Sequence, residues 1–144
     1  MNRNDVLKML EARKIGKIKL PQAFSKPPPL ALAGKDLSNA DLSGLDLQCA
    51  NLFRANLAGA NLCGTALSRA NLYEANLTGC KFDDKTNLSS ANLYGCKIDN
   101  ATGFSKSCCK KANLKGASLT GAVTALELKN PKYFDEANIA GVVL

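Results

Sequence analysis

The sequence of 144 residues contains no histidine, and this absence bears directly on catalysis. Histidine is the commonest general base and the usual activator of a serine or cysteine nucleophile, so neither chemistry has its ordinary partner here. The sequence also lacks a glycine-rich phosphate loop ending in Lys-Ser or Lys-Thr, and it lacks a His-Glu-x-x-His motif. We therefore expect a protein that is not an enzyme and that needs no cofactor.

Long runs of apolar residues are also missing, since none approaches the roughly 18 to 20 residues of a membrane-spanning helix. The N-terminus is basic, but no continuous apolar segment precedes the small residues of 27–34, as it would in a signal peptide. The sequence thus predicts a cytoplasmic protein without a transmembrane segment.

Six cysteines occur without any Cys-x-x-Cys pair, and without histidine the usual metal-binding sets cannot form. Cys80 and Cys96 occupy a position that alanine otherwise fills, which favours small buried side chains over metal ligands. Cys108 and Cys109 are adjacent and lie among three lysines, which can lower the pKa of a thiol. A redox or metal role for this pair stays open beside the simpler interpretation, in which Cys109 fills a core position.

Leucine is abundant, and its placement is the main signal in the sequence. From Leu37 to Phe82 every fifth residue is apolar, with nine leucines and one phenylalanine in ten places. On an α-helix each five-residue step turns the chain by about 500°, which would scatter these side chains around the helix. A small residue two positions before most leucines would instead share one side of a short extended segment. Glycine and serine in between favour turns, so we expect coils with five residues per side.

The five-residue pattern is interrupted in three places. One extra residue falls within 83–87, and another falls within the degenerate stretch 103–111. Across 123–133 the pattern fades, and Pro131 favours a loop or short helix over 126–137. The pattern then returns in phase at Phe134, Ile139 and Leu144.

Blocks such as ADLSG (40–44), ANLFR (50–54) and ANLTG (75–79) resemble the pentapeptide repeat family, whose motif is A(D/N)Lxx. The resemblance covers roughly residues 36–122 and 134–144. It implies an all-β fold, a right-handed quadrilateral parallel β-helix with four repeats per coil, in which the central leucine and the small residue point inward. It implies little about function, because the motif describes a scaffold. The family is abundant in cyanobacteria, which favours a bacterial and cyanobacterial origin.

The sequence itself supports four repeats per coil, because stacked positions then recur after 20 residues, or 21 across an extra residue. Besides the two cysteines, the residues that replace the inward alanine include Leu45, Thr65 and Thr86. The aromatic residues that directly follow a central leucine are Phe53, Tyr73 and Tyr94. Both sets are spaced by 20 and then 21 residues, so we expect each set to form a column along the coil axis.

Two parts of the chain are predicted. Residues 1–35 are expected to form a basic helix over 4–15, begun by Asn4 or Asp5, and a proline-rich connector over 19–34. We expect this part to cap the first coil. The apolar residues on one side of the helix are Val6, Leu7, Met9 and Leu10. Residues 36–144 are expected to form the β-helix, with an irregular insert at about 123–133.

Charge is distributed unevenly over the chain, whose formal net charge is +7. Residues 1–35 carry +6, residues 36–82 carry −1 and residues 83–144 carry +2. Some acidic family members mimic duplex DNA and inhibit type II topoisomerases, but such mimicry needs about one negative charge per 1.7 Å of axis. The nearly neutral coil disfavours a DNA mimic. The basic N-terminus keeps nucleic-acid or membrane-surface binding as alternatives, although no nucleic-acid motif accompanies it.

The candidate site is the outward aromatic column. Stacked rings can simply stabilise a β surface, but tyrosine and arginine are also frequent at protein interfaces. We predict a strip that binds an unidentified protein, made by Phe53, Arg54, Tyr73, Glu74, Tyr94 and Lys115. No catalytic, cofactor-binding or metal-binding residue is predicted. Because family members often dimerise end to end, the apolar residues Val142, Val143 and Leu144 are a candidate homodimer interface.

Overall fold

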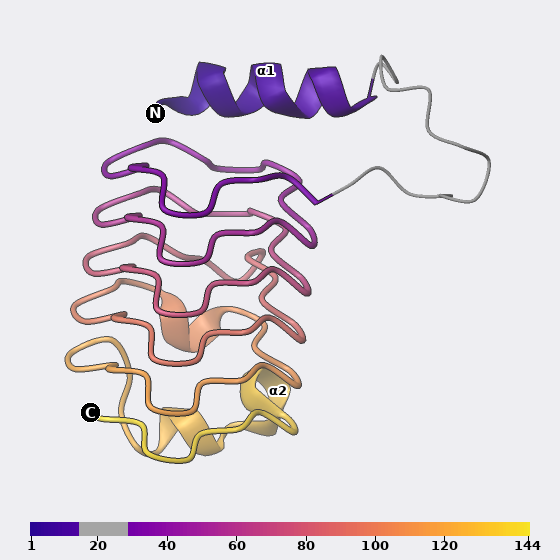
Figure 1. The fold of residues 1–144 in the computed structure, drawn as a ribbon. Coiled ribbons are helices and arrows are strands. Elements are labelled where there is room, and N and C mark those ends of the chain that lie inside the picture. Colours follow the sequence, from indigo (N-terminus) through magenta and orange to yellow (C-terminus); the bar gives the residue numbers. More distant parts are fainter. Residues whose placement is uncertain (15–28) are drawn as a thin grey trace.

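The computed structural model describes residues 1–14 and 29–144, which form a helix and a stack of coils. Helix α1 (Arg3–Lys14) lies across the first coil, and the later coils follow in chain order (Figure 1). Residues 19–28 of the predicted connector lie outside the described residues. Neither described range contains a helix with the length and apolar character of a membrane span.

Successive coils are joined by parallel backbone pairing at every fifth residue. Ala31 pairs with Asn51 and Asn51 with Asn71, so one coil takes 20 residues and has four pairing positions. Later coils take 21 residues, and the last takes 25, as shown by the pairing of Asn113 with Asn138. Within 29–144 each pairing is a single bridge rather than a longer strand, because a turn follows every extended stretch. The pairing begins at Ala31, ahead of the expected start at 36.

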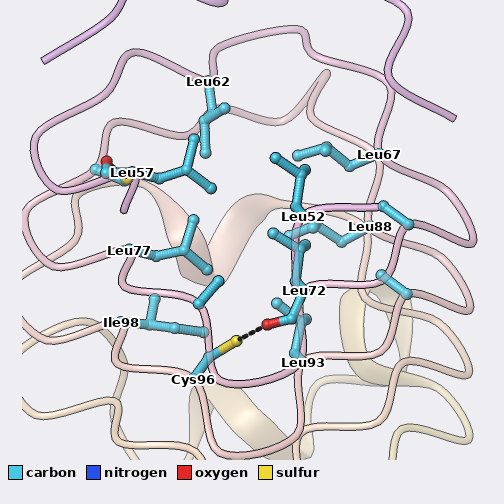
Figure 2. Close-up of a cluster of buried hydrophobic side chains, with 14 of the residues drawn as sticks. Leu52, Leu57, Leu62, Leu67, Leu72, Leu77, Leu88, Leu93, Cys96 and Ile98 are labelled. Atoms are coloured by element: carbon cyan, nitrogen blue, oxygen red, sulfur yellow. Dashed lines mark hydrogen bonds between the residues drawn. The ribbon is translucent and has the colours of Figure 1, made fainter. Parts of the chain in front are cut away.

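The interior of the coil consists of leucine layers. The central leucines between Leu32 and Leu119 are fully buried, and so are nearly all the alanines two positions before them. Side chains from successive coils stack in columns, for example Leu52, Leu72 and Leu93 (Figure 2). Burying one leucine side chain contributes roughly 1.5–3 kcal/mol, so the repeated layers supply the main stabilising term.

Each side of the coil ends in a tight turn that explains the last two residues of the repeat. The N–H of Ala55 donates to the carbonyl of Leu52 at 3.0 Å, and Arg54 has a φ of 52°. A positive φ at the third residue alone is the pattern of a type II turn, which glycine adopts most easily. Glycine holds this position in many repeats, including Gly59 and Gly64.

The three interruptions of the repeat lie on one side of the coil. They are residues 83–86, the 3₁₀ turn η1 (Phe104–Lys106), and the pair η2 (Glu127–Lys129) and α2 (Pro131–Phe134). Beneath them lie three buried phenylalanines, Phe82, Phe104 and Phe134. Their ring centroids are 5.2 Å apart in the first pair and 6.1 Å apart in the second. Where a loop or short helix was expected over 126–137, the structure has η2 followed by α2, which returns the chain to its core position.

Helix α1 covers the first coil with apolar and polar contacts. Val6 is fully buried, while the other apolar residues of the predicted face, Leu7, Met9 and Leu10, pack against the core. The N-terminal amino group donates to the carbonyl of Asp36 at 2.7 Å, and Arg3 donates to the carbonyl of Ser43 at 2.8 Å. These carbonyls belong to the first coil, for whose edge the described residues supply no preceding coil to pair with.

The residue that begins α1 differs from the prediction. Asn2, and not Asn4 or Asp5, caps the helix, because its Oδ1 accepts the N–H of Asp5 at 3.1 Å. Asp5 returns the interaction by accepting the N–H of Asn2 at 2.9 Å, which is the reciprocal pattern of a capping box. The prediction was wrong because several neighbouring residues are good caps, and the sequence pattern alone does not choose between them.

Candidate functional site

The outward aromatic column is a stack of three rings, which we call the aromatic ladder (Phe53, Tyr73 and Tyr94). The first two ring centroids are 5.7 Å apart with planes at 26°, and the last two are 5.1 Å apart with planes at 7°. All three side chains are half-buried. The backbone sets their register, because Arg54 N–H donates to the Tyr73 carbonyl and Glu74 N–H donates to the Tyr94 carbonyl, both at 2.9 Å.

A row of asparagine side chains supports the aromatic ladder, and we call it the amide ladder (Asn51, Asn71, Asn92 and Asn113). Asn71 Nδ2 donates to Asn51 Oδ1 at 3.4 Å, and the next two steps are 3.2 Å each. The same Oδ1 atoms accept the backbone N–H two residues later, which belongs to Phe53, Tyr73, Tyr94 or Lys115. Each asparagine therefore holds its own turn and joins two coils.

The predicted strip did not include the amide ladder. Its signal was present in the sequence, because asparagine precedes the central leucine at the same 20- and 21-residue spacing as the rings. In the sequence this signal cannot be told apart from the repeat motif, in which asparagine recurs on other sides as well. The hydrogen bonds show that these asparagines position the ladder residues.

Arg54 and Glu74 form an ion pair beside the aromatic ladder. Arg54 Nε lies 2.7 Å from Glu74 Oε2, although the two side chains stay 62% and 37% exposed. The Arg54 guanidinium also lies 4.9 Å from the centroid of the Phe53 ring, within the range of a cation–π contact. Hydrogen bonding to Glu74 and its negative charge raise the pKa of the Tyr73 phenol, so this hydroxyl stays protonated at neutral pH.

Lys115 continues the column after Tyr94. Its carbonyl accepts the N–H of Gly95 at 3.0 Å, which places it in the following coil. The Lys115 side chain is exposed and forms no ion pair with the residues of 1–14 and 29–144. Arg69, at the corner that leads into the middle ring, is also exposed. The structure thus brings the predicted strip residues to one side of the coil.

All six cysteines are free of disulfide bonds, and three of them have thiols of low reactivity. The thiols of Cys80 and Cys96 donate to the carbonyls of Leu57 and Leu72 at 3.0 and 2.8 Å; Figure 2 shows the second bond. Burial raises the pKa of Cys80, Cys96 and Cys109 to about 12. A buried protonated thiol is a poor nucleophile and a poor metal ligand. Cys109 fills a core position, as in the simpler interpretation, and the chain as far as it is described holds no metal-binding cluster.

Three aspartates of the first coil stabilise turns. The Oδ1 atoms of Asp36, Asp41 and Asp46 each accept the backbone N–H two residues later at 3.1 Å. Hydrogen bonds from Ser38 lower the pKa of Asp36, and hydrogen bonds from Ser43 lower the pKa of Asp41. An aspartate accepts but does not donate, which suits the first coil, because residues 1–14 and 29–144 include no earlier coil to receive a bond.

The apolar residues predicted as a dimer interface lie on the last coil, which is at the opposite end from α1 (Figure 1). Val143 pairs with Ser118 through the backbone, and its side chain is 58% exposed. Leu144 is 47% exposed, whereas Val142 is half-buried and packs against the core. Ile139 adds an exposed apolar side chain to this surface.

Comparison with known proteins identifies the repeat. A family model of pentapeptide repeats, with eight copies, matches residues 31–57 and 50–84. Comparison with curated proteins gives no match.

Several solved structures are similar to the chain. It is 31% identical to HetL, a pentapeptide repeat protein involved in heterocyst differentiation regulation from the cyanobacterium Nostoc sp. strain PCC 7120. That match covers 80% of this chain but only 50% of HetL, with a TM-score of 0.51. A pentapeptide repeat protein of the Arabidopsis thaliana thylakoid lumen is 32% identical over 67% of this chain and 70% of its own, with a TM-score of 0.27. Another from Nostoc is 26% identical over 96% and 94% of the two chains, with a TM-score of 0.34.

Proposed function

Because this chain belongs to the pentapeptide repeat family, we propose that it acts as a non-enzymatic module that binds another protein through its aromatic ladder. The observation that carries this proposal is the stack of three half-buried rings beside an exposed arginine–glutamate pair. Rigid aromatic and arginine side chains are favoured at interfaces, because little conformational freedom is lost when they bind. HetL is involved in regulation, which supports a regulatory role for the complex that this chain would form with its partner protein.

The charged pair occupies positions where glycine would fit more easily. Arg54 and Glu74 have φ values of 52° and 55°, and the same column holds glycine in other coils, at Gly34, Gly95 and Gly116. The left-handed conformation costs a non-glycine residue roughly 1–2 kcal/mol. An exposed ion pair contributes about 0–1 kcal/mol, so fold stability alone does not account for the pair. A second ion pair with positive φ values, between Lys111 and Glu136, belongs to a different column. It is therefore the position of Arg54 and Glu74 beside the rings that supports a binding role.

The proposal also covers the handedness of the coil, the cellular compartment and the source of the protein. We take the coil to be a right-handed quadrilateral β-helix in a cytoplasmic, cyanobacterial protein. Support comes from the family, from the Nostoc structures among its similar proteins, and from six free cysteines, which suit a reducing compartment.

The two competing functions have weaker support. A DNA mimic needs dense negative charge, whereas residues 36–82 carry only −1. Binding to nucleic acid or membranes through the basic N-terminus would need free cationic groups, and Arg3 is engaged with the first coil. Lys8 is exposed, while Lys17 and Lys19 lie outside the described residues.

Protein capture from the native cell extract tests the proposal. The wild-type chain is compared with a ladder variant that combines Phe53→Ser, Tyr73→Ser and Tyr94→Ser, after circular dichroism shows that both are folded. A second variant with Lys8→Gln, Lys17→Gln and Lys19→Gln removes charge from the N-terminal part. We expect a protein that is captured by the wild type and the second variant but lost from the ladder variant. Capture that depends on the three lysines and not on the rings would overturn the proposal.

We also propose that the exposed apolar residues of the last coil, Val143 and Leu144 with Val142 beside them, form a homodimer interface. Their exposure and the backbone edge of the last coil support this contact.

A further inference from the structure

Resting on the proposed function, we infer that the partner segment bound along the aromatic ladder is an extended acidic peptide. The inference depends on which parts of the rings remain accessible and on the sign and spacing of the charges around them.

Most faces of the ladder rings are covered by neighbouring side chains, although the outer face of Tyr94 has no ring stacked on it among the described residues. Tyr73 stacks between Phe53 and Tyr94, and the Arg54 guanidinium lies over Phe53. The rings are still partly exposed, so what they present to solvent is mainly their edges. An aromatic ring has a negative face and a positive edge. A row of ring edges therefore favours negative groups and offers little open face to a nucleobase, which binds by stacking.

The charged side chains around the aromatic ladder favour the same kind of partner. Arg54 lies at one end of the ladder and Lys115 follows the other end. Glu74, the one acid of the strip, pairs with Arg54 through Nε, but the Arg54 side chain stays 62% exposed and can still meet a second carboxylate. Arg69 and Lys115 are exposed and form no ion pair with the described residues, so their charges remain accessible to a ligand.

The spacing of the two end charges fits an extended chain. Arg54 and Lys115 belong to coils that are three steps apart, because the ladder residues and Lys115 occupy successive coils. Strands paired side by side are about 4.8 Å apart, which gives about 14 Å along the axis. An extended peptide rises about 3.3 Å per residue and covers this length in about four residues, with residues i and i+4 on one side. We therefore expect two acidic residues four positions apart.

The test is an NMR titration of the full chain, labelled with ¹⁵N, with the peptide Gly-Glu-Gly-Ser-Gly-Glu-Gly. We expect the amide shifts to concentrate at the ladder residues and Lys115. Lys115→Gln should weaken binding at least threefold, and so should Tyr73→Leu with Tyr94→Leu, which leaves the net charge unchanged. The matched control is Lys81→Gln, an exposed lysine half a coil after Asn71, which should leave the affinity unchanged.

Three results would overturn the inference. Equal weakening by Lys115→Gln and Lys81→Gln would mean that the peptide is held by the general basic charge of the chain. Equal binding of the same peptide with lysine in place of glutamate would exclude an acidic preference, and tighter binding of oligothymidine at the ladder would identify a nucleic acid. If ladder-dependent protein capture persists in any of these cases, the proposed function stands and only the acidic partner is wrong.

Discussion

Asn92 Nδ2 donates to Asn71 Oδ1 at 3.2 Å across one coil, and the same oxygen accepts the N–H of Tyr73 at 3.3 Å. One side chain thus fixes the turn that presents a ring and ties that turn to the next coil. The aromatic ladder is therefore held by hydrogen bonds beneath it as well as by contacts between the rings.

Asn71→Ala should destabilise the fold by about 1–3 kcal/mol, because the Tyr73 N–H and the Asn92 amide lose their acceptor in a partly buried place. Asn71→Asp keeps the acceptor and loses only the bond donated to Asn51, so its cost should be smaller. Urea unfolding of both variants measures the difference. Equal losses would show that the acceptor role is unimportant.

Arg54→Gly should leave the free energy of unfolding unchanged or raise it by up to about 1 kcal/mol. Glycine relieves the positive φ of 52°, and the exposed ion pair that is lost contributes little. Capture of the partner should nevertheless fall. Thermal unfolding and capture are measured side by side, and a clear loss of stability would contradict this account of the residue.

Stability should decline as the pH falls below 3.8, the ordinary pKa of aspartate, because hydrogen bonds from Ser38 and Ser43 hold the pKa values of Asp36 and Asp41 below it. A carboxylate with a lowered pKa contributes stability above its unfolded value and loses it as the pH falls through its folded value. The double variant Asp36→Asn and Asp41→Asn should lose less of its free energy of unfolding over the same acidic pH range. Denaturant unfolding between pH 2 and pH 6 provides the measurement, and an unchanged loss would assign acid sensitivity to other groups.

The five-residue spacing was enough to predict the columns. Exceptional residues such as Leu45, Thr65 and Thr86, and likewise the three rings, recur at the spacing of one coil, so they must stack. Other features depend on contacts that spacing does not encode. The position of Phe104 under one face was not predicted, because it follows Ile98 by six residues and its place depends on the stacked interruptions. The hydrogen bond from Arg3 to the Ser43 carbonyl joins two segments that are distant in the sequence, so spacing could not predict it.

Buried thiols should react only when the chain opens. Because burial raises the pKa of Cys80, Cys96 and Cys109 to about 12, a thiol reagent at pH 8 should label these three residues only after denaturant is added. Mass spectrometry of labelled peptides locates the sites, with exposed Cys49 as the internal control. Rapid labelling of Cys109 in the native chain would reopen a redox role for the Cys108–Cys109 pair.

Val143→Glu should shift the chain from dimer to monomer, because it places a charge in the apolar surface of the last coil. Val143 bonds to its neighbouring coil through backbone groups, so the substitution leaves those bonds in place. Leu126→Glu is the matched control, since Leu126 is 81% exposed but belongs to the insert and not to the C-terminal residues of the last coil. Light scattering coupled to size-exclusion chromatography gives the mass of all three proteins. A monomeric wild type would refute the dimer proposal, and dissociation by both variants would place the contact on a broader surface than the last coil.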